Sequence, residues 1–278
     1  MESLDTRVAI ARTRRNVVAM GTLLGAAAIE ALATGRARAE DGGGDDDGGG
    51  DDGGGHHGGG GGHNCLLRGT HVRTPAGNKK IEDIKIGDLV LTRSGEAKPV
   101  LWVARRRYRR DPGVAWSPHV APIRVAGGAL GPNTPTADLF LSDRHALYFD
   151  GALIPVVELL NDKTITRYPA HELDELEYLH LKLAAHDVIF AEGAACDSLR
   201  AGTIDKFDNA AEYEQLYGPA SASEPACAPI LGFVGGRSAL ASRWRSAVSP
   251  LVDRRTLLDR VRDELEERAE RLPLPAAA

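Results

Sequence analysis

The sequence predicts an all-β domain that begins at Cys65. From this residue onward, short runs rich in Val, Ile, Leu and Thr alternate with turn-forming Gly, Pro, Asn and Asp. Residues 1–64 lack this alternation, and after Gly218 the chain becomes rich in Pro, Ala and Ser. We therefore expect one folded core of modest size in the 278 residues, between an unpacked N-terminal arm and a C-terminal helix.

Residues 1–39 have the features of an export signal. Arg14-Arg15 opens an apolar, Ala/Gly-rich run, and Ala37–Ala39 offers a small-x-small cleavage site before Glu40. The paired arginines indicate the twin-arginine route, so we expect an exported protein; a helical leader on a cytoplasmic protein is the alternative. The run is interrupted by Glu30 and is too short for a stable membrane span.

The composition of residues 40–64 predicts a flexible linker. From position 41 to position 63 the chain contains only Gly, Asp and His, which cannot bury enough apolar surface to offset the entropy of ordering. The formal net charge of -5 is concentrated here and identifies no partner. His56, His57 and His63 are weak candidate metal ligands, but the repeat period of calcium-binding arrays is missing. No metal or cofactor is predicted.

Eleven short segments after Cys65 have the composition of β-strands. They are residues 71–74, 79–81, 88–92, 98–107, 123–126, 138–141, 146–149, 152–155, 164–168, 177–183 and 187–191. Turn residues such as Asp150-Gly151 separate them. Val156 to Leu160 fits a short helical turn.

Arg105 to Arg110 is a basic run with a single aromatic residue at the end of one predicted strand. Such a run is more typical of a solvated sheet edge that discourages strand pairing than of a nucleic-acid site. No nucleic-acid partner is therefore predicted.

The region after residue 200 divides into two parts. Residues 201–250 are interpreted as a linker. Residues 251–272 predict an amphipathic helix, because Leu257, Leu258, Val261 and Leu265 recur at helical spacing against Glu and Arg. We expect this helix to dock on the domain or to lie on its surface.

Three cysteines, Cys65, Cys196 and Cys227, are too few and too scattered for a disulfide framework or a metal site. Cys196 lies on the last strand and is expected to be a buried, inert thiol, with a disulfide to Cys227 as the alternative in an oxidising compartment. Cys65 is different, because it stands where the linker meets the β-domain and is followed by His145 and a histidine-bearing strand.

Three sequence blocks carry a resemblance to a known family. The run from Cys65 to Gly77 (CLLRGTHVRTPAG), with residues 81–92 (IEDIKIGDLVLT), closely resembles the opening block of bacterial Hint (hedgehog/intein-type) domains. Residues 141–147 (LSDRHAL) resemble the family's Thr/Ser-x-x-His block, and residues 178–193 (YLHLKLAAHDVIFAEG) resemble its closing strand pair. The resemblance spans about residues 65–200 and implies the horseshoe-like, all-β Hint fold.

The resemblance also implies chemistry. Cys65 is placed to attack the carbonyl carbon of Asn64 through a five-membered ring, an N-to-S acyl shift that yields a thioester. Intramolecular placement supplies much of the rate, because effective molarities reach about 10⁵ to 10⁸ M. By resemblance, His145 protonates the departing amide nitrogen and Ser142 helps to hold that peptide.

Two departures from the family pattern matter. His180 stands where an Asp is common; it is either a base for the thiol proton or a histidine that faces outward from its strand. His186 resembles a further family histidine near the site. A splicing intein ends this last block in His-Asn followed by Cys, Ser or Thr. The corresponding residues here are Asp197 and Ser198, so the asparagine that cyclises is missing.

We therefore expect a single-turnover self-cleavage at Asn64–Cys65 without splicing. The substrate is the chain's own N-terminal segment, the acyl acceptor is water, a thiol or an amine, and no cofactor is needed. Two other functions remain open. In the first, the domain is a non-catalytic β module that presents the Asp/His-rich arm to partners. In the second, the protein binds ions through residues 41–63.

Overall fold

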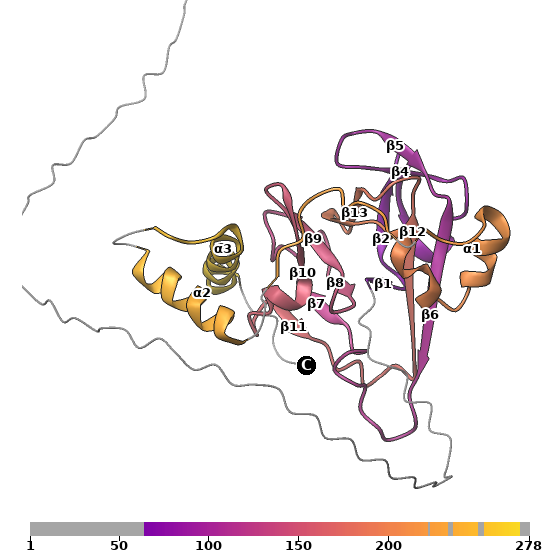
Figure 1. Ribbon diagram of the computed structural model, residues 1–278. Coiled ribbons are helices and arrows are strands. Elements are labelled where there is room, and N and C mark those ends of the chain that lie inside the picture. The colour runs from indigo at the N-terminus through magenta and orange to yellow at the C-terminus, as the bar shows by residue number, and fades with distance from the viewer. Residues whose placement is uncertain (1–63, 222, 233–235, 250–252, 273–278) are drawn as a thin grey trace, which may run out of the picture. The chain divides into compact units, whose positions relative to one another are not determined.

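The computed structural model describes residues 64–221, 223–232, 236–249 and 253–272 (Figure 1). The predicted signal segment, the Gly/Asp/His linker and His56, His57 and His63 lie outside these residues.

The described chain is built mainly from short strands, which confirms the all-β prediction. The strands are β1 Leu66–Leu67, β2 His71–Thr74, β3 Gly77–Lys80, β4 Leu89–Leu91, β5 Ala97–Pro99, β6 Trp102–Arg109, β7 Ile123–Val125, β8 Leu139–Leu141, β9 Ala146–Phe149, β10 Ala152–Pro155, β11 Ile165–Arg167, β12 Glu175–Lys182, β13 Val188–Ala191 and β14 Ala194–Asp197. The helices are the 3₁₀ turns η1 Ile81–Asp83, η2 Val156–Leu159 and η3 Ala201–Lys206, and the α-helices α1 Ala210–Tyr217, α2 Gly236–Val248 and α3 Leu257–Arg271.

Two six-stranded antiparallel sheets form the domain, in the orders β11-β7-β8-β1-β12-β6 and β10-β9-β14-β13-β2-β3. A separate hairpin pairs β4 with β5. In each large sheet, strands from the middle of the domain (β7 to β11) lie at one end, and strands from its beginning (β6 in the first sheet, β2 and β3 in the second) lie at the other. Figure 1 shows this grouping, with β7 to β11 gathered away from β4, β5 and β6.

One hydrophobic core joins the two large sheets. It includes fully buried residues from both, such as Leu66 and Leu181 from the first and Val72, Leu147 and Ile189 from the second. A second cluster covers the opposite face of the first sheet and contains Trp102, Tyr178 and Phe207, together with Cys65. Alternate residues of β1 and β12 thus face different cores, as the two-residue period of a strand requires.

The basic run lies on β6, which is the edge strand of its sheet. The free main-chain groups of this edge are taken up by the loop before α1. The N–H of Arg105 donates to the side-chain oxygen of Asn209, and the N–H of Arg107 donates to Asp208. This loop covers the edge and prevents further strands from pairing there.

Several elements differ from the sequence prediction. Residues 98–107, expected to be one strand, are divided between β5 and β6 by Val100 and Leu101, which belong to neither strand. The two-residue β1 was not predicted, and the last strand, on which Cys196 was expected, is β14, for which the prediction gave no bounds. Residues 201–250, interpreted as a linker, contain η3, α1 and α2.

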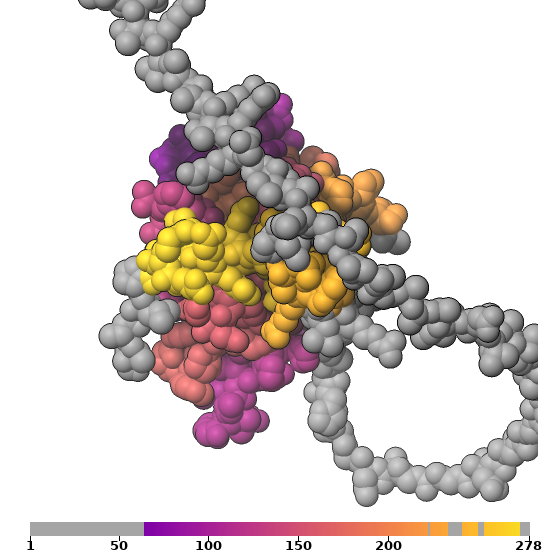
Figure 2. Space-filling model, turned by 90° about the vertical axis from the view of Figure 1, so that its left-hand side faces the viewer, coloured from indigo at the N-terminus to yellow at the C-terminus, as the bar shows by residue number. Residues whose placement is uncertain are grey.

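The C-terminal helix α3 packs on the domain. It begins at Leu257, later than expected, because Thr256 and Asp259 form a capping box there. Its apolar face joins the main core through Leu258, Val261 and Leu265. Arg245 of α2 makes a two-pronged ion pair with Asp259, at 2.6 and 3.0 Å, and Figure 2 shows the two helices side by side. None of the helices in the described residues is long and apolar enough to cross a membrane.

Candidate functional site

Strand β1 places Cys65 between two other strands. Leu66 pairs with Leu141 of β8 on one side and with Leu179 of β12 on the other. Both pairings are antiparallel, so the residue before Leu66 lies opposite the residue after Leu141 and the residue after Leu179. Cys65 is thereby aligned with Ser142 on one side and His180 on the other. Residues directly opposite each other in antiparallel strands point their side chains to the same face.

Ser142 holds the peptide unit at Cys65. The N–H of Cys65 donates to Ser142 Oγ at 2.7 Å, and the N–H of Ser142 donates to the carbonyl oxygen of Cys65 at 3.0 Å. Both residues are buried. The nitrogen of the Asn64–Cys65 bond is therefore fixed by a direct contact with a side chain that comes from a distant part of the chain.

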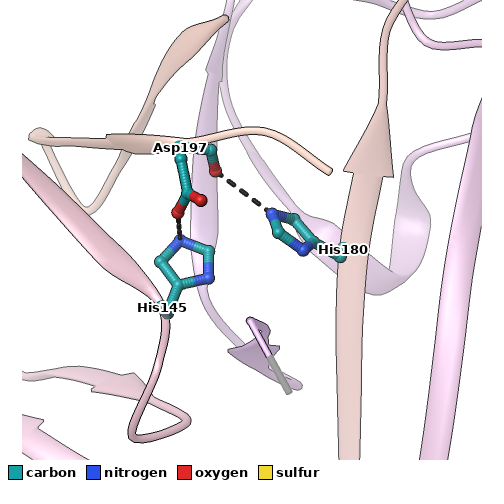
Figure 3. Close-up of side chains that lie close together, drawn as sticks. All are labelled: His145, His180 and Asp197. Carbon is teal, nitrogen blue, oxygen red and sulfur yellow. Dashed lines mark hydrogen bonds and ion pairs between the residues drawn. The ribbon is translucent and has the colours of Figure 1, made fainter. Parts of the chain in front are cut away.

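His145 follows β8 and is fully buried. Its Nε2 lies 3.5 Å from Oδ1 of Asp197, the pair drawn in Figure 3. Burial lowers the pKa of His145, and the Asp197 charge and a contact with the main chain of Asn64 oppose that shift. Neither ring nitrogen makes a full hydrogen bond within the described residues, but the ring faces the Asp197 carboxylate and has the main chain of Asn64 as a second neighbour.

His180 points into the site rather than outward, so the outward-facing alternative is wrong. Its Nε2 lies 3.1 Å from the main-chain oxygen of Asp197, which can only accept a hydrogen bond. Nε2 therefore carries the proton, and Nδ1 is a free lone pair that is buried without a hydrogen-bond partner in the described residues. Burial, assisted by neighbouring His145, lowers the pKa of His180 to about 3. The ring is neutral at pH 7.

Asp197 is the residue that the sequence analysis missed as a member of the site. It ends β14 and is fully enclosed, and its Oδ1 accepts the N–H of Ala146 at 3.0 Å. Burial alone would raise the pKa of this carboxyl, but three surrounding histidines outweigh burial and lower it. The available signal was a lone acidic residue in a strand that otherwise reads Ala-Ala-Cys.

His186 reaches the same carboxylate from the loop after β12. Its Nε2 lies 3.7 Å from Asp197 Oδ2, and its Nδ1 accepts the main-chain N–H of Cys227 at 2.9 Å. The structure therefore brings the histidines His145, His180 and His186 around one buried carboxylate.

The three cysteines are not bonded to one another. Cys65 and Cys196 are buried and Cys227 is exposed, and all three are free thiols, so the alternative of a Cys196–Cys227 disulfide is not realised. Burial, assisted by the charge of Asp197, raises the pKa of the Cys65 thiol far above its usual range. This thiol is protonated at neutral pH and needs a nearby base before it can act as a nucleophile.

A family model described as the Hint domain matches residues 64–203, half of the chain. This chain belongs to the Hint domain family. Among solved structures, the gp41-1 intein is 18% identical, with 48% of this chain and 96% of that chain covered and a TM-score of 0.34. A bacterial intein-like domain from Clostridium thermocellum is 15% identical, with 49% and 99% covered and a TM-score of 0.33. Curated proteins give no match.

The Hint domain's buried cluster also offers groups of the type that bind metals. One ligand atom from each of His145, His180 and Asp197 lies within 4.8 Å of the other two. A tetrahedral zinc ion holds such atoms at about 2.0–2.2 Å, which brings them roughly 3.4 Å apart. The pair His145 Nε2 and Asp197 Oδ1, 3.5 Å apart, is close to that spacing, so the residue types of the cluster are compatible with a metal ion.

The predicted site residues of the Hint domain therefore fall into two groups. Ser142 and His145 contact the Asn64–Cys65 peptide, and His180 is aligned with Cys65 by the pairing of β1 with β12. His186 lies beside Asp197, whose other oxygen faces His145.

Proposed function

We propose that this Hint domain cleaves its own main chain at the Asn64–Cys65 bond through a thioester. The observation that carries the proposal is that two side chains bracket this bond. Ser142 Oγ accepts the N–H of Cys65 at 2.7 Å, and the His145 ring contacts the main chain of Asn64. Membership of the Hint family, whose domains process themselves, supports the same reaction.

In the first step, the Cys65 thiol attacks the Asn64 carbonyl carbon and its proton passes to Nδ1 of His180. This role is supported by the pairing that sets Cys65 opposite His180 and by the lone pair at Nδ1, which has no partner in the described residues. The neutral ring offers a lone pair at pH 7, and the charge of Asp197 favours the imidazolium that forms, against the burial that lowers the pKa of His180. The S–C bond forms as the carbonyl becomes tetrahedral.

In the second step, the C–N bond breaks, and the proton taken from the thiol passes from His180 to His145, whose ring centroid lies 4.8 Å from that of His180, and from His145 to the nitrogen of Cys65. An imidazolium at this position is stabilised by the ionised Asp197, which lies 3.5 Å away. A buried carboxylate behind a histidine fixes its orientation and supports its positive form, as in the serine protease triad. Ser142 keeps the departing nitrogen in place while this occurs.

The thioester is then cleaved without splicing, by water, a thiol or an amine. Asp197 offers a carboxylate where a splicing intein has a carboxamide, and both of its oxygens face histidines. Two hydrogen bonds join Ser198 to Asp187. The N–H of Ser198 donates to the carbonyl oxygen of Asp187 at 2.8 Å, and the N–H of Asp187 donates to the hydroxyl of Ser198 at 2.9 Å. The chain then continues into buried Leu199, so the downstream flank is part of the folded domain.

We also propose that residues 1–39 direct export, so that the released piece is the leader and arm. Each molecule would react once, with its own N-terminal segment as the substrate.

The test is the mass of the full-length protein after incubation with dithiothreitol or hydroxylamine. We expect fragments that correspond to residues 1–64 and 65–278, with hydroxylamine trapping Asn64 as a hydroxamate. Cys65→Ala abolishes cleavage, whereas Cys196→Ala, which alters an equally buried thiol, leaves it intact. A chain that stays whole under both reagents contradicts the proposal and favours the non-catalytic module.

A further inference from the structure

The segment 223–231, here called the C-terminal strap, lies beyond the residues that match the Hint family and contacts the site. One end of the strap is anchored by Glu224. Its carboxylate accepts Lys182 Nζ at 3.0 Å, the N–H of His186 at 2.8 Å and the N–H of Ala201 at 2.7 Å. Lys182 is itself buried, so this ion pair is largely shielded from solvent.

The other end of the strap is joined to strand β10. The N–H of Leu153 donates to the carbonyl of Pro229, and the N–H of Leu231 donates to the carbonyl of Leu153, both at 2.8 Å. Ile230 thereby forms a parallel bridge with Leu153. The strap is fixed at both ends and passes His186 between them.

At that point the strap determines which nitrogen of His186 carries the proton. A main-chain N–H can only donate, so Nδ1, which accepts from Cys227 at 2.9 Å, must be unprotonated. A neutral His186 then carries its proton on Nε2, the atom 3.7 Å from Asp197 Oδ2. The strap thus makes His186 present a donor, rather than a lone pair, to the buried carboxylate.

The effect reaches the scissile bond through Asp197. A donor at Oδ2 stabilises the ionised carboxylate, whose other oxygen faces Nε2 of His145. The opposite tautomer of His186 would set a lone pair against the negative oxygen and push the carboxylate from its place. This dependence is the usual one for a histidine whose second nitrogen is fixed by a hydrogen bond.

Resting on the proposed self-cleavage, we propose that the C-terminal strap is a positioning element of the reaction, through the Cys227 N–H and its anchor Glu224. The thiol of Cys227 has no part in this role. The strap therefore links cleavage at one end of the Hint domain to correct folding of the chain that follows it.

The experiment compares full-length variants. Cys227→Pro removes the N–H, whereas Cys227→Ala keeps it and loses only the thiol. We expect cleavage by Cys227→Pro to slow by about tenfold to hundredfold, the effect of a misplaced catalytic group, and Cys227→Ala to react at the wild-type rate. Glu224→Gln, which weakens the anchor without a proline, is expected to slow the reaction in the same direction. Equal rates for Cys227→Pro and Cys227→Ala would overturn the proposal.

A second measurement does not depend on cleavage. In full-length Cys65→Ala, ¹⁵N NMR of the imidazole rings is expected to show His186 with its proton on Nε2, and Cys227→Pro in the same background is expected to populate the other tautomer. A wild-type strap that leaves His186 protonated on Nδ1 contradicts the inference. If no variant cleaves, the proposed reaction fails while this measurement still decides the role of the strap.

Discussion

The main-chain N–H of Cys65 donates a hydrogen bond to the hydroxyl of Ser142, a residue 77 positions further along the chain, at 2.7 Å. The two residues meet because β1 pairs with β8, and the reciprocal bond from Ser142 N–H to the Cys65 carbonyl locks the pair. The first residue of the domain is therefore held at both its peptide nitrogen and its carbonyl oxygen by one residue.

Replacing this hydroxyl should impair cleavage more than folding. Ser142→Ala leaves the buried N–H of Cys65 without its acceptor, at a cost of about 1–3 kcal/mol in the free energy of unfolding. We expect thiol-induced cleavage to slow by about tenfold or more, because the departing nitrogen is no longer held in place. Ser142→Thr keeps the hydroxyl and should retain most of the rate, and the exposed Ser117→Ala serves as the matched control. A wild-type rate in Ser142→Ala would remove this residue from the mechanism.

The carboxylate of Asp197 should matter through its charge. Asp197→Asn is nearly isosteric, but it removes the negative partner of His145 and sets an amide against Nε2 of His186. In a comparable arrangement, Asp to Asn behind a catalytic histidine costs about 10⁴-fold in rate. We expect a loss of at least about a hundredfold, measured as the rate constant of fragment formation. The exposed Asp205→Asn should have no effect; a similar loss in both variants would argue for a general electrostatic cause.

Ser142 and Asp197 show how far the site could be predicted from the sequence. Ser142 and His145 form a local motif, so their relation to Cys65 was predictable from the resemblance, and so was the all-β fold. Asp197 was considered only as a replacement for an asparagine. Its role depends on three histidines that arrive from different segments, and no local pattern in β14 reveals that convergence.

The short elements illustrate a second limit. β1 has two residues, and its pairing on both sides exists only through long-range contacts with β8 and β12. Helix α2 was hidden by the composition after Gly218 that suggested a linker, and α1 is a short helix of eight residues just before it. Propensity is a weak prior for such segments, because packing against the domain decides their structure.

The C-terminal helix should contribute to stability without contributing to the reaction. Leu265 of α3 is buried in the main core, and Leu265→Ala should lower the free energy of unfolding by about 2–5 kcal/mol. Urea denaturation of the full-length chain in a Cys65→Ala background measures this, with Leu216→Ala, which is 52% exposed, as the control. The cleavage rate of Leu265→Ala is expected to match the wild type at temperatures where the variant is folded. A folded but inactive variant would show that α3 acts on the site.

The buried histidines should make the protein sensitive to mild acid. The pKa of His180 falls from 6.5 to about 3 on folding, chiefly because the ring is buried. Between these pH values the unfolded chain binds a proton that the folded chain excludes. The free energy of unfolding should therefore decrease as the pH is lowered through this window, by at most about 1.4 kcal/mol per pH unit for this group. The pKa of His145 is lowered by the same cause and adds to the effect, while Asp197 stays ionised until lower pH.

The urea midpoint measured from pH 7 to pH 4 tests this linkage in the full-length Cys65→Ala background. His180→Phe keeps a buried ring that cannot bind a proton, so its stability should vary less steeply with pH than that of the parent. His171 is exposed, and His171→Gln should leave the slope unchanged. An unaltered slope in His180→Phe would mean that the pKa of this ring is the same in the folded and the unfolded chain. Burial would then not hold the ring in its neutral form, which contradicts its fully enclosed position beside Asp197.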